Sequence, residues 1–354
     1  MNTDFLTLAT YFGERDRGAR GLVADELLDL YGSQRIAASV LLRGSEGFSQ
    51  RRQMRTGSLL SLSEDLPVVS IAVDTRERIE STLELVLAIK HRGLLTLERT
   101  ALLDGESTAP LPGADAKLTI YAGRRERVFG VPAFVAACEL LHRRGVAGAS
   151  VLLGVDGTRD GRRTRARFFA ANTQVPMMIV AVGAGELIAA AADELRELLR
   201  EPFMTLERVR VCKRDGRLLA NPHELPGSDA GGLPLWQKLT VYTSESTTRD
   251  GRPLNLEIIR RLRTSGAAGA TSLRGIWGFH GSQPPHGDRF LQVRRQVPVV
   301  TVTIDTPQRT ARSFEIIDEL TDEHGLVTSE MVPAAGALDE PERHRGLRLA
   351  RHDL

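Results

Sequence analysis

A threefold internal repeat constrains this chain more than any other feature. One motif occurs as LLRGSEGF (41–48), VLLGVDGT (151–158) and SLRGIWGF (272–279). A second follows each copy, as LPVVSIAVDT (66–75), VPMMIVAVGA (175–184) and VPVVTVTIDT (297–306). Offsets of 109–110 and then 121–123 residues hold along whole segments, so the chain contains three tandem copies of one unit of about 100 residues. Solenoid turns repeat roughly every 20–50 residues, so units of this size are whole domains.

The first unit predicts the element order β-α-β-β-α-β. Strands are predicted at 5–13, 38–44, 66–74 and 94–103, and helices at 21–31 and 76–92, from apolar periodicity and β-branched runs. The strand at 38–44 is expected to end at its glycine. This order is the split βαβ, or ferredoxin-like, arrangement. The expected fold class is therefore α+β, with three tandem ferredoxin-like units that each hold a four-stranded antiparallel sheet.

Composition shifts divide the chain into six segments. Stretches rich in Gly, Pro and Asp are typical of connectors. The predicted division is unit 1 at 1–104, a linker at 105–116, a divergent unit 2 at 117–213, a linker at 214–236, unit 3 at 237–335 and a charged tail at 336–354. The end of the tail, 340–354, is expected to be loose.

Composition and charge indicate an ordinary globular protein. The chain is 42% hydrophobic and 26% charged, with a formal net charge of +2. So small a net charge creates no bulk field that would require a nucleic acid or a membrane surface. The two cysteines, Cys138 and Cys212, suit a reducing cytoplasm, where we expect the protein to reside. The apolar stretch 175–192 is interrupted by Pro176 and Gly183, so we expect no membrane span.

Several motifs together resemble a known family. YFGERDR, LLRGSEGF, the basic loop after it and the GLLTLE segment of unit 1 are similar to a PII-like family of unknown function, as are RDGRPL, GAAGATSLRGIWGF and VPVVTVTIDT of unit 3. This family is related to the PII signal-transduction proteins. The resemblance covers roughly 8–103, 117–212 and 238–333. PII proteins are homotrimers whose sheets line a central barrel, so the resemblance implies a PII-like pseudo-trimer within one monomeric chain.

The resemblance also implies ligand clefts between neighbouring units. Glycines at a strand end let backbone N–H groups approach an anion, and an adjacent arginine can grip phosphate or carboxylate. The candidate ligand-binding residues are Arg43, Gly44, Gly47, Phe48, Arg274, Gly275, Gly278 and Phe279. The alternative is a strand-terminating turn with its aromatic ring packed on the sheet. Unit 2 has Leu153 and Thr158 in place of the arginine and phenylalanine, so the three clefts are expected to differ.

Arginines gather in the loop that follows this motif. The candidate partner-docking residues are Arg51, Arg52, Arg55, Arg162, Arg163, Arg165 and Arg289. By the resemblance these loops contact a protein partner, and the alternative is that they are merely solvated. Nucleic acid is not expected, because RNA-recognition domains stack bases on aromatic strand residues, whereas the corresponding strand here, PVVSIAV, is aliphatic.

Two smaller motifs have simple structural interpretations. Asp74-Thr75 and Thr306-Pro307 precede the second helix of units 1 and 3, where a side chain can accept from first-turn amides, so we predict helix caps. Glu98 and Glu207 lie on the final strands of units 1 and 2 and could pair with loop arginines.

Enzyme chemistry is not expected. The eight histidines show no metal-ligand spacing, and the chain lacks both the GxxxxGK[ST] phosphate loop and the GxSxG nucleophile elbow, so we predict no catalytic residue and no metal site. ATP-binding PII proteins use a Gly- and Lys-rich loop where this chain has KHRGLL, LREPFM and DEHGLV. The usual PII-type ATP site is therefore not expected, and the cofactor is unknown.

Two functions remain from the sequence. The first is a cytoplasmic PII-like regulator that binds a small anionic ligand between units and controls a partner through its loops; by family resemblance a membrane transporter or ion channel is a candidate partner. The second is a constitutive protein–protein adaptor without a small-molecule ligand. The two differ in whether a small molecule binds saturably.

Overall fold

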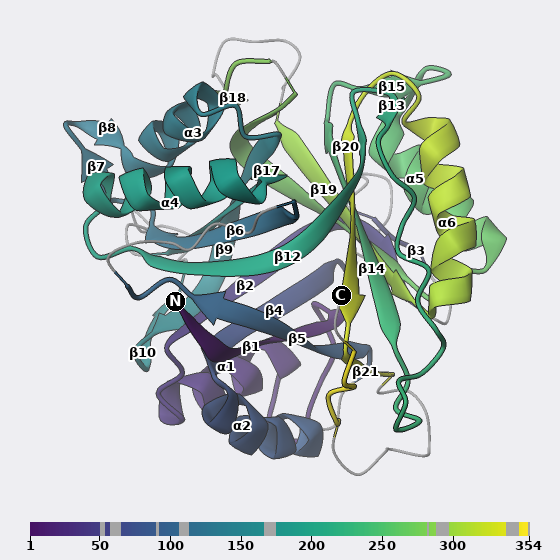
Figure 1. Cartoon of the computed structure of the whole chain (residues 1–354). Coiled ribbons are helices and arrows are strands. Elements are labelled where there is room, and N and C mark those ends of the chain that lie inside the picture. Colours follow the sequence, from purple (N-terminus) through teal and green to yellow (C-terminus); the bar gives the residue numbers. More distant parts are fainter. Residues whose placement is uncertain are drawn as a thin grey trace.

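The computed structural model describes residues 1–49, 54–56, 65–89, 92–105, 113–165, 175–281, 283–287, 297–337 and 347–352. Within these ranges 21 strands and six helices follow one another in three sets that match the sequence repeats (Figure 1). None of the helices described is long and apolar enough to cross a membrane.

The elements of the three repeats follow the same order. Repeat 1 contains β1 (Asn2–Gly13), α1 (Val23–Ser33), β2 (Ala38–Phe48), β3 (Met54–Thr56), β4 (Pro67–Thr75), α2 (Arg76–Ala88) and β5 (Leu94–Leu102). Repeat 2 contains β6 (Asp115–Gly123), β7 (Arg127–Val128), β8 (Val131–Pro132), α3 (Ala133–Arg143), β9 (Gly148–Arg159), β10 (Arg162–Arg165), β11 (Pro176–Ala184), α4 (Gly185–Leu198), β12 (Phe203–Arg214) and β13 (Arg217–Leu218). Repeat 3 contains β14 (Trp236–Ser244), β15 (Thr248–Arg249), β16 (Arg252–Pro253), α5 (Leu254–Ser265), β17 (Ala270–His280), β18 (His286–Gly287), β19 (Pro298–Asp305), α6 (Pro307–Leu320), β20 (Leu326–Val332) and β21 (Ala334–Ala337).

Strands of different repeats pair with one another in a ring. β2 pairs with β9 of repeat 2, β9 pairs with β17 of repeat 3, and β17 pairs back with β2. At the other end of the repeats β12 pairs with both β5 and β20, and β21 pairs with β5. The three repeats of one chain therefore close on one another through main-chain hydrogen bonds.

These pairings overturn the predicted fold class. We predicted an α+β protein of three tandem ferredoxin-like units, each with its own four-stranded sheet, and this is wrong. In the described residues, 17 strands belong to a single closed antiparallel sheet, and the only other sheets are the small hairpins β7–β8 and β15–β16. The physical reason is that an isolated four-stranded sheet leaves unpaired N–H and C=O groups along its edges. Here the edge strands of each repeat satisfy those groups on the next repeat.

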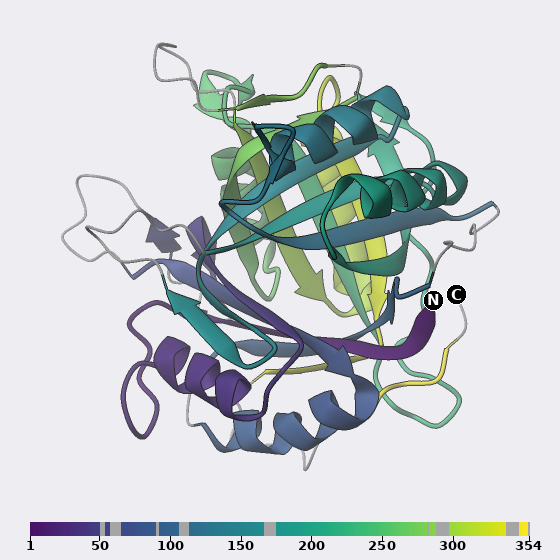
Figure 2. The same cartoon turned by 90° about the vertical axis from the view of Figure 1, so that its left-hand side faces the viewer.

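The helices cover the outside of the closed sheet, in one pair for each repeat (Figures 1 and 2). Strand β4 shows how both faces of the sheet are buried. Val68 and Ala72 pack against the repeat 1 helices, whereas Val69 and Val73 point the other way, into a central core shared by all three repeats. The branched, uninterrupted apolar sequence of this strand follows from burial on both sides.

The C-terminal segment is part of the packed structure. Strand β21 adds to the edge of β5, and the Ala350 N–H donates to the carbonyl of Pro333 at 2.9 Å. Leu347 and Leu349 pack against the core of repeat 1, and Ala350 is fully buried. The expectation of a loose end is therefore wrong for the described residues 347–352.

Candidate functional site

The glycines of the LRGxxGF motif lie where two repeats join. β2 runs through Gly44 and Gly47 without a break, so the expected strand end at Gly44 is wrong. A Cβ on Gly47 would lie 2.6 Å from the carbonyl oxygen of Ala270 in repeat 3, and one on Gly44 would lie 2.7 Å from Pro67 Cγ. Real Cβ atoms do not come this close to other heavy atoms, so a side chain at either position would require the strands or Pro67 to shift.

The same close approach occurs at all three junctions. A Cβ on Gly157 would lie 2.3 Å from the Ser39 carbonyl oxygen, and one on Gly275 would lie 3.0 Å from that of Val151. Repeat 2 keeps both glycines although it lacks the arginine and the phenylalanine of the motif. The glycines therefore have a packing role at each seam, where "seam" denotes the pairing of β2, β9 or β17 with the next repeat.

The arginines of the motif form exposed ion pairs with equivalent glutamates. Arg43 Nη2 lies 2.8 Å from Glu14 Oε2, and Arg274 pairs with Glu245 in the same way. All four side chains are at least one third exposed, so these pairs contribute little to stability. They leave both arginines at the surface, and a ligand role for them stays a prediction.

The aromatic rings of the motif pack into the core of the neighbouring repeat. Phe48 is buried among the α5 and α6 side chains of repeat 3. Phe279 is buried in the core of repeat 2, where its ring meets His142 edge to face at a centroid distance of 5.1 Å. In repeat 2 the equivalent Thr158 instead shares a 2.8 Å hydrogen bond with Ser39 of repeat 1.

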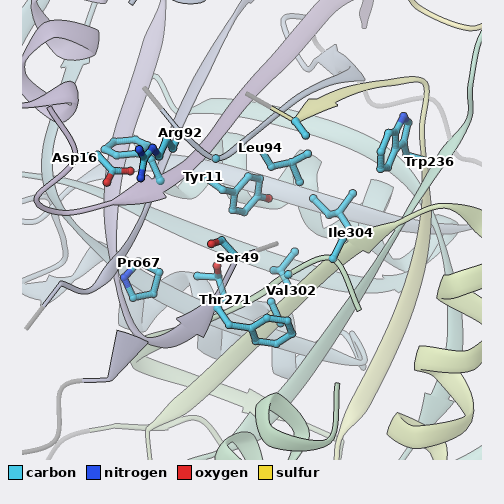
Figure 3. Close-up of a pocket in the computed structure, with 17 residues that line it drawn as sticks. Tyr11, Asp16, Ser49, Pro67, Arg92, Leu94, Trp236, Thr271, Val302 and Ile304 are labelled. Carbon is cyan, nitrogen blue, oxygen red and sulfur yellow. The ribbon is translucent and has the colours of Figure 1, made fainter. Parts of the chain in front are cut away.

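A cavity of about 120 Å³ lies beside the seam between repeats 1 and 3 (Figure 3). Repeat 1 contributes the ends of β1, β2 and β5, and repeat 3 contributes β17, β19 and Trp236. Asp16 and Arg92 lie at one end and Trp236 at the other, with Leu94, Val302 and Ile304 forming apolar wall between them (Figure 3). Ser49 and Thr271 add hydroxyl groups. An apolar pocket with a few polar groups is the usual form of a small-ligand site.

The corresponding position in repeat 2 is filled. Phe203 replaces Leu94 there, and its ring meets Tyr121 edge to face at 5.5 Å. Arg159, which replaces Ser49, places its guanidinium 5.0 Å from the centre of the same ring. The two clefts therefore differ through Phe203 and Arg159, whereas the expected difference rested on Leu153 and Thr158 and stays a prediction for ligand binding.

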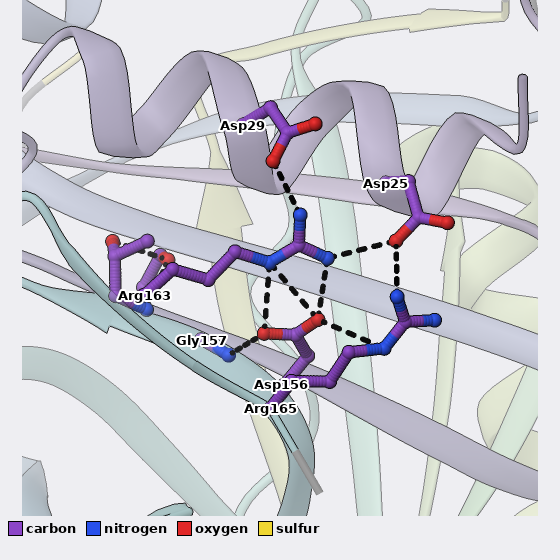
Figure 4. Close-up of polar contacts among 8 residues, drawn as sticks. Asp25, Asp29, Asp156, Gly157, Arg163 and Arg165 are labelled. Atoms are coloured by element: carbon purple, nitrogen blue, oxygen red, sulfur yellow. Dashed lines mark hydrogen bonds and ion pairs between the residues drawn. The ribbon is translucent and has the colours of Figure 1, made fainter. Parts of the chain in front are cut away.

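Two arginines of β10 pair both with Asp156 of repeat 2 and with acidic residues on α1 of repeat 1 (Figure 4). Arg163 contacts Asp156 at 2.6 Å and Asp25 at 2.8 Å, and it also pairs with Asp29 on α1. The hydrogen bonds that Arg163 donates to Asp156 raise the pKa of Arg163 above its ordinary value. Arg165 lies 2.9 Å from Asp25. Two of the candidate docking arginines thus link repeats 1 and 2 beside the seam of β2 with β9.

The other candidate docking residues are less defined. Arg162 is exposed on β10. The backbone of Arg55 lies opposite Gly47 in β3. Arg51, Arg52 and Arg289 lie outside the described residues.

Five buried ionic side chains meet on the inner face of the closed sheet. The carboxylates are Glu98, Glu207 and Glu330, at equivalent positions of the three repeats, and their oxygens lie within 4.8 Å of one another. Lys117 Nζ lies 2.5 Å from both Glu207 and Glu330, and Lys238 pairs with Glu98 and, at 3.0 Å, with Glu330. Glu98 and Glu207 thus pair with buried lysines, and the prediction that they pair with loop arginines is wrong.

The helix-cap prediction is also wrong for the side chains. No cap hydrogen bond is formed by Thr75 or Thr306. Asp74 instead accepts from the Ala37 N–H at 2.8 Å, and Asp305 accepts from the Ala268 N–H at 2.9 Å. Each aspartate therefore fixes the start of the strand that forms the seam, a role that only the folded structure reveals.

Comparison with known proteins identifies related sequences. Residues 5–102, 115–211 and 236–334 each match the DUF190 family, described as "Uncharacterized ACR, COG1993". A "UPF0166 protein" of Aquifex aeolicus (strain VF5) is 32% identical over 95 residues, which cover 27% of this chain and 88% of the relative. One copy of the repeat thus corresponds to nearly all of that protein.

Solved structures resemble the whole chain only weakly. An aspartate kinase from Synechocystis aligns with 94% of this chain at 11% identity and a TM-score of 0.27, and this chain spans 44% of its length. CrmK, a flavoenzyme of caerulomycin biosynthesis, aligns with 82% of this chain at 14% identity, a TM-score of 0.16 and 57% of its own length.

Proposed function

From the premise that this chain belongs to the DUF190 family, in three tandem copies, we propose that it is a non-enzymatic regulatory protein that binds a small anionic ligand between repeats 1 and 3. The observation that carries the proposal is the cavity beside this seam, which joins an apolar wall to a polar end formed by Arg92 and Asp16. The motifs that resemble PII signal-transduction proteins support a ligand site between repeats.

The size and lining of the cavity restrict the ligand. A cavity of roughly 150 Å³ admits benzene, so about 120 Å³ suits a body no larger than one small ring. The apolar side chains Leu94, Val302 and Ile304 favour an apolar body, and the Arg92 guanidinium favours a carboxylate or phosphate at one end. We therefore propose a small carboxylate or phosphate with a single-ring or branched apolar part.

Regulation would follow from the position of the cleft. The ligand would contact β2 of repeat 1 and β17 of repeat 3 together, and the basic segment after β2 begins next to Ser49. Binding would therefore tie repeat 1 to repeat 3 and change the surface that these two repeats present to a protein partner. The partner class, a membrane transporter or ion channel, and the cytoplasmic location belong to the proposal through the resemblance and through the two free, buried cysteines.

The test is a ligand panel read by two methods on the full chain. Aromatic and branched carboxylates, cyclic mononucleotides, adenine nucleotides and bicarbonate are screened by thermal shift. Hits are then titrated by fluorescence in a Trp277→Phe background, because Trp236 lines the cavity and is the only other tryptophan in the chain. We expect saturable quenching by at least one anion.

Variants separate this site from others. Arg92→Gln removes a charge-assisted hydrogen bond worth about 1.5–3 kcal/mol, so the affinity should fall by roughly 10- to 150-fold. Arg125→Gln removes an equally exposed charge elsewhere and should leave the affinity unchanged. The double change Leu94→Phe with Ser49→Arg copies repeat 2 and should abolish binding. If no compound binds, or if binding survives these changes, the proposal fails and the constitutive adaptor becomes the better explanation.

A further inference from the structure

The buried ionic cluster on the inner face contains more negative than positive side chains. Glu98, Glu207 and Glu330 supply three negative charges, while Lys117 and Lys238 supply two positive charges, a difference of one. All five residues are less than 10% exposed. A buried charge without a counter-charge costs several kcal/mol, because the low-polarity interior replaces water poorly.

The repeat shows where the missing positive charge belongs. Each glutamate lies directly opposite one residue of the first strand of its repeat: Glu207 faces Lys117 and Glu330 faces Lys238, whereas Glu98 faces Thr7. Thr7 is thus the third member of a set that is lysine in the other two repeats. Tyr11 follows Thr7 by four residues on the same face of its strand. Tyr121 follows Lys117, and Tyr242 follows Lys238, by the same four residues, so the three positions are equivalent.

Two buried oxygens of the inner face have no partner among the described residues. The hydroxyl of Thr7, a residue that is 8% exposed, forms no hydrogen bond with any described residue. The same is true of Glu330 Oε1, although Glu330 Oε2 contacts both lysines. Buried polar atoms are nearly always satisfied, so such atoms mark the place of a bound water or ion.

We propose that a monovalent alkali cation, K⁺ or Na⁺, binds in the centre of the molecule beside Thr7, Glu98 and Glu330, in place of the third lysine ammonium. Carboxylate and hydroxyl oxygens are the hard ligands that such ions take. One positive charge balances the cluster, whereas a divalent ion would leave it with an excess of one.

The experiment compares cations at equal ionic strength. The Tm of the full chain is measured after exhaustive dialysis into KCl, NaCl or choline chloride, and bound alkali metal is measured by atomic emission on protein in KCl or NaCl after rapid gel filtration into choline chloride. We expect Tm to rise and level off with KCl or NaCl but not with choline chloride, and about one ion per chain to remain. Arg92→Gln leaves this effect unchanged, so its outcome is independent of the ligand proposal.

Two variants test the assignment to Thr7. Thr7→Lys supplies the missing ammonium, so we expect at least a tenfold loss of bound metal and a Tm that no longer depends on the cation. Thr7→Val keeps the shape without the hydroxyl and should weaken the dependence even if Thr7→Lys fails to fold. If the wild-type Tm is the same in all three salts and no metal is bound, the cluster is balanced by a proton and the proposal is overturned. A cation effect that persists in both variants overturns the assignment as well.

Discussion

Replacement of one seam glycine measures how tightly the repeats are joined. In Gly157→Ala the new Cβ would lie 2.3 Å from the Ser39 carbonyl oxygen and 2.5 Å from Pro176 Cγ. Both atoms belong to strands held on two sides, so the strands must separate. Overpacking of this kind costs about 1–3 kcal/mol. Loss of the nearby Ser39–Thr158 hydrogen bond adds about 1 kcal/mol. We therefore expect the free energy of unfolding to fall by about 2–4 kcal/mol.

The assay is urea unfolding followed by circular dichroism, with Gly21→Ala as the matched control. A Cβ on Gly21 meets nothing within 4 Å, and its backbone conformation suits alanine. The control should stay within about 0.5 kcal/mol of wild type. If Gly157→Ala were as stable as Gly21→Ala, the glycines would not be required for strand contact, and the packing explanation of the motif would be refuted.

Three further changes test other parts of the structure. Arg163→Ala leaves the buried Asp156 carboxylate without its main cationic partner and should lower the free energy of unfolding by about 2 kcal/mol. Arg162→Ala on the same strand should lower it by less than about 0.5 kcal/mol. Equal losses in urea titrations would contradict the ion cluster between repeats 1 and 2. Burial lowers the pKa of His280 below its ordinary value of 6.5. As the pH falls through 6.5, His280 is therefore protonated in the unfolded chain before it is protonated in the folded chain, so the free energy of unfolding should decrease. That part of the pH dependence should vanish in His280→Gln. Phe129 is 98% exposed and has a φ of 50°, and the equivalent residue of repeat 3 is Asp250. Aspartate tolerates this backbone conformation better, so Phe129→Asp should raise the free energy of unfolding by about 0.5–1 kcal/mol. A decrease in the free energy of unfolding would contradict this explanation.

The sequence predicted the repeat and the positions of its elements well. In repeat 1 the predicted strands at 5–13 and 66–74 correspond to β1 and β4, and the helix at 76–92 corresponds to α2, within a few residues. These elements depend on local periodicity and β-branched composition, which one sequence displays.

The joining of the repeats could not be predicted in this way. A glycine pair after a strand predicts a turn, and only the position of β17 against β2 shows that the glycines admit a neighbouring strand. The same limit applies to Glu98, because its partner Lys238 is 140 residues away in the sequence. The comparison of Leu94 with Phe203, and of Ser49 with Arg159, was available from the repeat alignment and could have indicated which cleft is open.

Closure of the three repeats within one chain is the central claim, and a cross-link at the seam between repeats 1 and 3 tests it most directly. Glu46 and Ser272 lie opposite each other in β2 and β17, and facing residues of paired strands are close enough for a disulfide. The variant Glu46→Cys with Ser272→Cys is oxidised and examined by non-reducing electrophoresis, with each single variant as control; the native cysteines are both buried. We predict a cross-link within one chain of 38.8 kDa, with no higher species. Cross-linked dimers or larger species as the main product would show that the repeats pair between chains and would contradict the account.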